Sequence, residues 1–172
     1  HVGGASYLQD TYGARILISG PDWDLALSGD RPDRPRPTRD MVVTDGQKLT
    51  LGDTTVTLVL TPGHTAGTLA MFIPVKHRGR THTALIFSGT TIPDQKSLAV
   101  FKHVFDDFAR PLRAETVLGA HPGISMNTLE LHDQLRQQYP EAAHPLLIGE
   151  EPFDRYMSIM LECASAKLSA LE

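Results

Sequence analysis

The hydrophobic pattern of the first forty residues predicts one short strand, one short helix and a loop. Residues 14–19 form an apolar run bounded by glycines, which predicts a buried strand. Asp22 follows where it can cap a short helix that runs to about Leu27. Residues 29–39 contain three prolines and four arginines, a composition typical of an irregular surface loop. We interpret these arginines as solvated, with attraction of an anionic substrate as the alternative.

Residues 41–88 predict β-structure throughout. Five runs are predicted to be strands: 41–43, 48–51, 55–60, 68–75 and 83–88. Asp45-Gly46 and Gly52-Asp53 separate the first three runs and favour hairpins. His77 and His82 lie where the last two strands are joined, and we expect both side chains to be solvated.

The apolar period becomes helical from residue 96 onward. Residues 96–109 place Leu98, Phe101, Val104, Phe105 and Phe108 in one stripe. Residues 129–139 and 152–171 predict two further helices, and the last helix has its own apolar stripe: Phe153, Tyr156, Met157, Met160, Leu161, Ala164 and Leu168. We interpret Cys163, in the same helix, as a small core residue. Together these elements predict an α+β sandwich of two sheets with helices outside.

Composition limits the classes of function. With 172 residues and 41% hydrophobic positions, the chain is predicted to form one domain with a real core. The net charge of −4 argues against a nucleic-acid partner, and no apolar run approaches the roughly 20 residues of a membrane span. A single cysteine excludes an internal disulfide framework and a cysteine-based zinc site.

Two histidines directly follow predicted strands. His64 lies in the run TPGHTAGT and His121 in the run LGAHPG, each after an apolar strand and small residues. Open α/β sheets place their chemistry beyond the carboxyl ends of strands, and imidazole is a common metal ligand. A third histidine, His1, precedes the pair Gly3-Gly4. The pattern predicts that these imidazoles converge on one cleft.

These three motifs resemble the metallo-β-lactamase superfamily, and most closely its B3-type branch. The resemblance implies the αβ/βα sandwich fold and two zinc ions. His64 would bind the first zinc, and His1 and His121 would bind the second. The family motif His-x-His-x-Asp-His is represented only by its last histidine, His1. We therefore expect residues 1–172 to form a single domain, N-terminally incomplete, that corresponds to the C-terminal two-thirds of the family domain.

The resemblance also implies a reaction. A zinc-bound hydroxide would attack a cyclic amide, such as a β-lactam, in a small-molecule substrate. Thr90 lies where B3-type enzymes have a serine that binds no metal, and it is a candidate substrate contact, although a turn threonine is the simpler interpretation. Hydrolysis of a lactone or another amide is an alternative. A metal-poor, non-catalytic remnant is another, since half of the ligand motif is missing.

The remaining expectations concern location, assembly and other histidines. The resemblance favours a periplasmic or secreted protein. An incomplete sandwich leaves sheet edges uncovered, so we expect a homodimer or a retained N-terminal segment. His103 and Asp107 share a helix face, where a solvated pair is a better interpretation than a metal site. His132 and His144 show no partner pattern.

Overall fold

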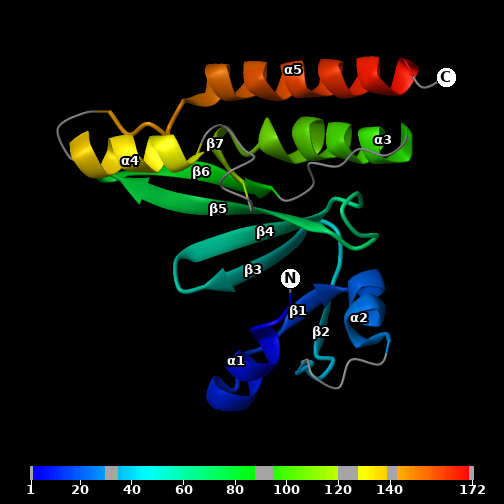
Figure 1. The fold of residues 1–172 in the computed structure, drawn as a ribbon. Coiled ribbons are helices and arrows are strands. Elements are labelled where there is room, and N and C mark those ends of the chain that lie inside the picture. The colour runs from blue at the N-terminus through cyan, green and yellow to red at the C-terminus, as the bar shows by residue number, and fades with distance from the viewer. Residues whose placement is uncertain (1, 30–34, 88–94, 120–127, 139–142, 171–172) are drawn as a thin grey trace.

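Two β-sheets of unequal size organise the chain (Figure 1). The computed structural model describes residues 2–29, 35–87, 95–119, 128–138 and 143–170. In the smaller sheet β1 (Leu17–Ser19) pairs in parallel with β2 (Met41–Val43). The larger sheet has the strand order β3-β4-β5-β6-β7. Its strands are β3 (Gln47–Leu51), β4 (Thr54–Leu60), β5 (Leu69–His77), β6 (Arg80–Phe87) and β7 (Ala114–Gly119).

The larger sheet is antiparallel except at one edge. Pairs β3–β4, β4–β5 and β5–β6 are antiparallel, whereas β6 and β7 are parallel. The turn between β5 and β6 is formed by Arg78 and Gly79, whose φ angles are 49° and 77°. Positive φ at both central residues is the requirement of a type I′ turn, which matches the twist of a two-stranded hairpin.

Helices cover the larger sheet on one face, and the smaller sheet lies on its other side (Figure 1). On the helical face are α3 (Gln95–His103), a π-helical segment η1 (Val104–Ala109), α4 (Thr128–Gln138) and α5 (Glu150–Ser169). The smaller sheet carries α1 (Ala5–Tyr12) and α2 (Gly20–Leu27). In the described parts of the chain, no helix is long and apolar enough to cross a bilayer.

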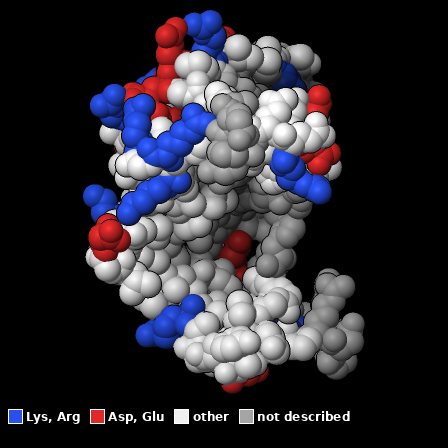
Figure 2. Space-filling view, turned by 90° about the vertical axis from the view of Figure 1, so that its left-hand side faces the viewer, with Lys and Arg blue, Asp and Glu red and all other residues white. Residues whose placement is uncertain are grey.

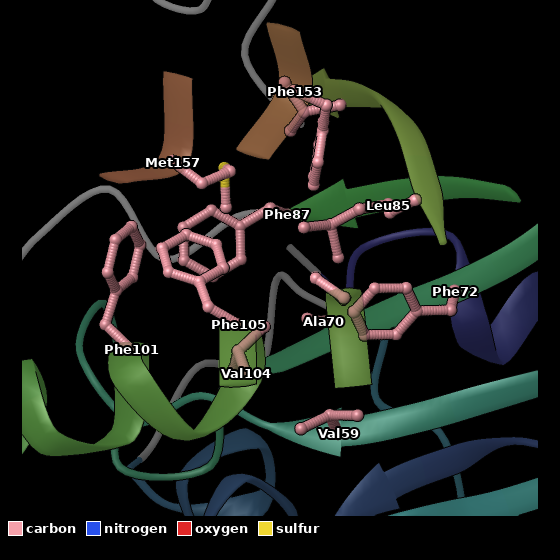
Figure 3. Close-up of a cluster of buried hydrophobic side chains, with 13 residues drawn as sticks. Val59, Ala70, Phe72, Leu85, Phe87, Phe101, Val104, Phe105, Phe153 and Met157 are labelled. Atoms are coloured by element: carbon pink, nitrogen blue, oxygen red, sulfur yellow. The ribbon is translucent and has the colours of Figure 1, made fainter. Parts of the chain in front are cut away.

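The core lies between the larger sheet and the helices (Figure 3). Phe72 and Leu85 extend from the sheet, and Phe105, Phe153 and Met157 meet them from η1 and α5, each at most 4% exposed. Burying a side chain of this size contributes roughly 1.5 to 3 kcal/mol. This packing holds the larger sheet against the helices, and the ends of its strands are held in place with it.

Most predicted elements are present, and several details of the predictions are wrong. The buried strand predicted over 14–19 is limited to Leu17–Ser19 and is only partly buried. Asp45-Gly46 does not form a hairpin, because β2 and β3 belong to different sheets. The helix after β1 is present, but Asp22 lies in its first turn and not at its N-cap. Its N-cap position is occupied by Ser19.

The last helix exposes two residues that were predicted to be buried. Met160 is 37% exposed and Cys163 is an exposed free thiol. The neighbouring positions Phe153, Met157 and Leu168 are buried as predicted. α5 lies at the surface of the helical layer, so only one side of it meets the core (Figure 1). The apolar stripe predicted from the sequence is therefore wider than the face that packs.

Candidate functional site

The carboxyl ends of three strands meet at one edge of the larger sheet. Because β4 is antiparallel to β5 and β5 is antiparallel to β6, strands β4 and β6 run in the same direction, and β7 runs with them. The chain leaves this edge after Leu60, Phe87 and Gly119. His64 comes four residues after Leu60, and His121 comes two residues after Gly119. The strand directions therefore place Leu60 and Gly119, the strand ends that precede the two histidines in sequence, at the same edge.

His64 lies in the loop between β4 and β5, and its side chain is exposed. The amide of Thr61 donates to the carbonyl of Thr68 at 2.7 Å, which closes the loop. Inside it, the amide of Thr65 donates to Oγ1 of Thr68 at 2.8 Å. The amide of Gly63 donates to the carbonyl of Thr65 at 3.0 Å. The backbone on both sides of His64 is thus hydrogen-bonded, and His64 itself is an exposed residue.

The same loop is bonded to the smaller sheet and α2. Asp22 Oδ2 accepts from the Thr65 hydroxyl at 2.6 Å, and Asp22 Oδ1 accepts from the Gly67 amide at 2.9 Å. The hydroxyl of Ser19 donates to the Gly67 carbonyl at 2.7 Å. A Cβ atom at Gly67 would lie 1.9 Å from Ser19 Oγ, so this approach requires glycine. Ser19 and Asp22, at the start of α2, therefore hold a loop that lies more than forty residues further along the chain.

A second carboxylate anchors the strand that leads into the loop. Asp45 Oδ1 accepts from the amide of Leu60 at 2.8 Å, and Asp45 Oδ2 lies 3.0 Å from His103 Nε2. His103 also contacts Asp107 through Nδ1, as the helical spacing predicted. The hydrogen bond with Asp45 is the main cause that raises the pKa of His103; partial burial opposes it and Asp107 adds to it. The sequence did not predict the contact between His103 and Asp45, which are 58 residues apart.

Three predicted site residues lie outside the described residues: His1, Thr90 and His121. Within the described ranges, no three His, Cys, Asp or Glu side chains are grouped so that they could hold a metal ion. The chemistry of the predicted donors fits zinc, which accepts imidazole nitrogen and, in catalytic sites, needs a position open to solvent. His64, an exposed residue, offers one such imidazole.

Other histidines gather at the opposite end of the larger sheet. His82 Nδ1 lies 2.6 Å from Glu115 Oε2, and only 10% of the His82 side chain is exposed. The prediction that His82 is solvated is therefore wrong. The rings of His77 and His144 meet edge to face, with centroids 5.0 Å apart. Burial lowers the pKa of His144, and the neighbouring His77, His132 and His82 lower it further.

The described arginines of the 29–39 loop are bonded within the chain. Arg36 donates to the carbonyls of Leu27 and Gly29, and Arg39 pairs with Asp24 at 2.8 Å. Arg31 and Arg34 lie outside the described residues. The described arginines therefore have structural partners, and attraction of an anionic substrate stays a prediction.

On the face shown in Figure 2 the surface is hollowed below its centre, and acidic atoms lie in the hollow.

Solved structures share the arrangement of these elements, although no protein-family model and no curated protein matches the sequence. BJP-1, a subclass B3 metallo-β-lactamase of Bradyrhizobium japonicum, matches with a TM-score of 0.69 and 22% identity over 100% of this chain and 71% of its own. Native FEZ-1 metallo-β-lactamase from Legionella gormanii matches with a TM-score of 0.73 and 20% identity, over 99% and 70%.

A third match is the metallo-β-lactamase GOB-18 from Elizabethkingia meningoseptica, with a TM-score of 0.66 and 18% identity over 100% of this chain and 68% of that one. At these identities the likeness establishes the fold. The chain has the metallo-β-lactamase αβ/βα fold, in agreement with the resemblance found in its sequence. It spans about 70% of the length of these neighbours.

Proposed function

We propose that this chain, with its metallo-β-lactamase fold, carries part of a zinc site that hydrolyses a cyclic amide such as a β-lactam. The observation that supports the proposal is the common direction of β4 and β7, whose carboxyl ends lead to His64 and His121. Zinc, when bound, acts as a Lewis acid and lowers the pKa of a coordinated water to about 7. The chain itself has to hold the metal and orient the substrate.

The residues have separate roles in this proposal. His64 would hold the first zinc, while His1 and His121 would hold the second. Thr90, three residues after the end of β6, would donate a hydrogen bond to the substrate. The hydrogen bonds across the His64 loop hold the residue that follows His64 in place. Such positioning matters because a displacement of about 1 Å can cost on the order of 100-fold in rate.

Two other functions are consistent with the same observations. Hydrolysis of a lactone or another amide would need the same attack on an acyl carbon, and substrate profiling separates it from β-lactam hydrolysis. A metal-poor, non-catalytic module is the second candidate. It is supported by the division of three histidines between two zinc positions, since zinc sites with ligands missing lose affinity. The family resemblance favours a periplasmic or secreted location, which fractionation of the source cells would test.

Zinc-dependent turnover of nitrocefin tests the proposal. The wild-type chain with added zinc should hydrolyse nitrocefin at a measurable rate that depends on the zinc concentration. His64→Ala should remove this turnover. His132→Ala, which changes an exposed histidine on α4, is the matched control and should leave it unchanged. Equal turnover by wild type and His64→Ala, or none at any zinc concentration, would contradict the proposed function.

A further inference from the structure

Two residues outside the His64 loop bond it to the smaller sheet and α2. The hydrogen bonds of the loop's own backbone close the segment from Thr61 to Thr68 at the end of the β4–β5 hairpin but do not reach α2 or the smaller sheet. The described hydrogen bonds that attach residues 65–67 to another element come from Asp22 and Ser19. These two residues lie where β1 ends and α2 begins.

Asp22 contacts the first and the third residue after His64, Thr65 and Gly67. One carboxylate oxygen accepts from the Thr65 hydroxyl at 2.6 Å, and the other accepts from the Gly67 amide at 2.9 Å. An ionised carboxylate has only acceptors, so both hydrogen bonds run toward Asp22 and are of the stronger, charge-assisted kind. The Asp22 side chain therefore holds the Thr65 side chain and the Gly67 backbone.

Packing gives independent evidence that this contact is specific. Gly67 is buried, and a Cβ atom there would lie 2.7 Å from Asp22 Oδ1 as well as 1.9 Å from Ser19 Oγ. The φ angle of Gly67 is not in the left-handed region, so glycine is needed here for space alone. The N-cap of α2 is Ser19, and the described side-chain hydrogen bonds of Asp22 run to the loop.

We propose that Asp22 is a positioning residue for the metal-binding His64. The inference rests on the proposed function for its metal and on the contacts above for its geometry. Removing the carboxylate should leave the two sheets intact and loosen the His64 loop, which would keep its hydrogen bond with Ser19. Zinc would then bind to an imidazole that first has to be ordered. Losing the residue that orients a ligand typically lowers metal affinity by about 10- to 100-fold.

The variants Asp22→Ala and Asp24→Ala make a matched pair. Both remove a carboxylate from α2, but Asp24 is exposed and pairs with Arg39 at the surface. Asp22→Asn is the conservative variant. Its amide keeps one oxygen to accept from the Gly67 amide and can donate to Oγ1 of Thr65, so most of the geometry survives without the charge.

The first measurement is made on the zinc-free chain by NMR spectroscopy. In Asp22→Ala, hydrogen exchange of the Gly67 amide should become faster and the His64 ring signals should shift or broaden. The amide signals of β5–β7 should not move, which shows that the fold is intact. Asp24→Ala should match wild type, and Asp22→Asn should lie between wild type and Asp22→Ala. Identical Gly67 exchange in Asp22→Ala and Asp24→Ala would overturn the inference.

The second measurement follows the His64 ring signals during titration with zinc sulfate. Asp22→Ala should need at least about tenfold more zinc for the same shift of the His64 signals. Asp22→Asn should recover part of the lost zinc affinity. Equal zinc responses in Asp22→Ala and Asp24→Ala would overturn the link to metal binding. If zinc moves the His64 signals in none of the proteins, the proposed function is wrong, while the exchange of Gly67 still decides whether Asp22 holds the loop.

Discussion

The close approach at Gly67 gives the sharpest stability prediction. In Gly67→Ala the new Cβ would meet Ser19 Oγ at 1.9 Å and Asp22 Oδ1 at 2.7 Å, so the loop and α2 must separate. Overpacking of this kind costs about 1 to 3 kcal/mol. The separation also weakens the hydrogen bonds of Gly67 with Ser19 and Asp22, which contribute roughly 1 and 2 kcal/mol. We expect a total loss of about 3 to 5 kcal/mol.

Thermal unfolding followed by circular dichroism measures this loss. For a chain of this size, 1 kcal/mol corresponds to about 2 to 4 °C, so Tm should fall by roughly 10 °C. Gly3→Ala is the matched control, because a Cβ at Gly3 would have nothing within 4 Å. Adding Ser19→Ala to Gly67→Ala should cost less than the sum of the two single changes, since it removes the closest contact. A Gly67→Ala protein with the same Tm as Gly3→Ala would refute the steric argument.

Two further predictions concern groups around β4. The raised pKa of His103 means that its charged form is stabilised in the folded protein, so its contribution is full below the ordinary pKa near 6.5 and is lost as the pH rises through the folded pKa. The Tm advantage of wild type over His103→Gln should therefore be larger at pH 5.5 than at pH 9, and an advantage independent of pH would contradict it. Thr61 Oγ1 is buried without a hydrogen-bond partner among the described residues. Thr61→Val should leave chemical-denaturation stability unchanged or raise it by about 1 kcal/mol, whereas a clear loss would reveal an unseen partner.

The sequence predicted the candidate site best where a histidine directly follows a strand. An apolar run, small residues and a histidine form one continuous signal, and the structure has β4 and β7 end just before His64 and His121. That these ends lie at one edge depends on strand order. Strand order is set by packing between distant segments, and no local pattern contains it.

Contacts between distant segments were the main omission. Asp22 was interpreted as a helix cap because Asp before an apolar run is a common cap, yet its partners lie 43 and 45 residues further on. Asp45-Gly46 was interpreted as a hairpin turn for a similar reason, and Asp45 instead accepts from the amide of Leu60. In both cases a polar residue with a good local role serves a tertiary one. His82 was missed in the same way, since Glu115 is 33 residues away.

Equilibrium zinc binding by competition with a chromophoric chelator tests the central claim most directly. The claim is that His64 and His121 bind metal at one edge of the larger sheet. His64→Ala and His121→Ala should each weaken zinc binding by about tenfold or more, because each removes a direct ligand. His82→Ala, in the cluster at the opposite end of the sheet, should not. Zinc affinity that is unchanged in both His64→Ala and His121→Ala, or that falls only in His82→Ala, would contradict the account.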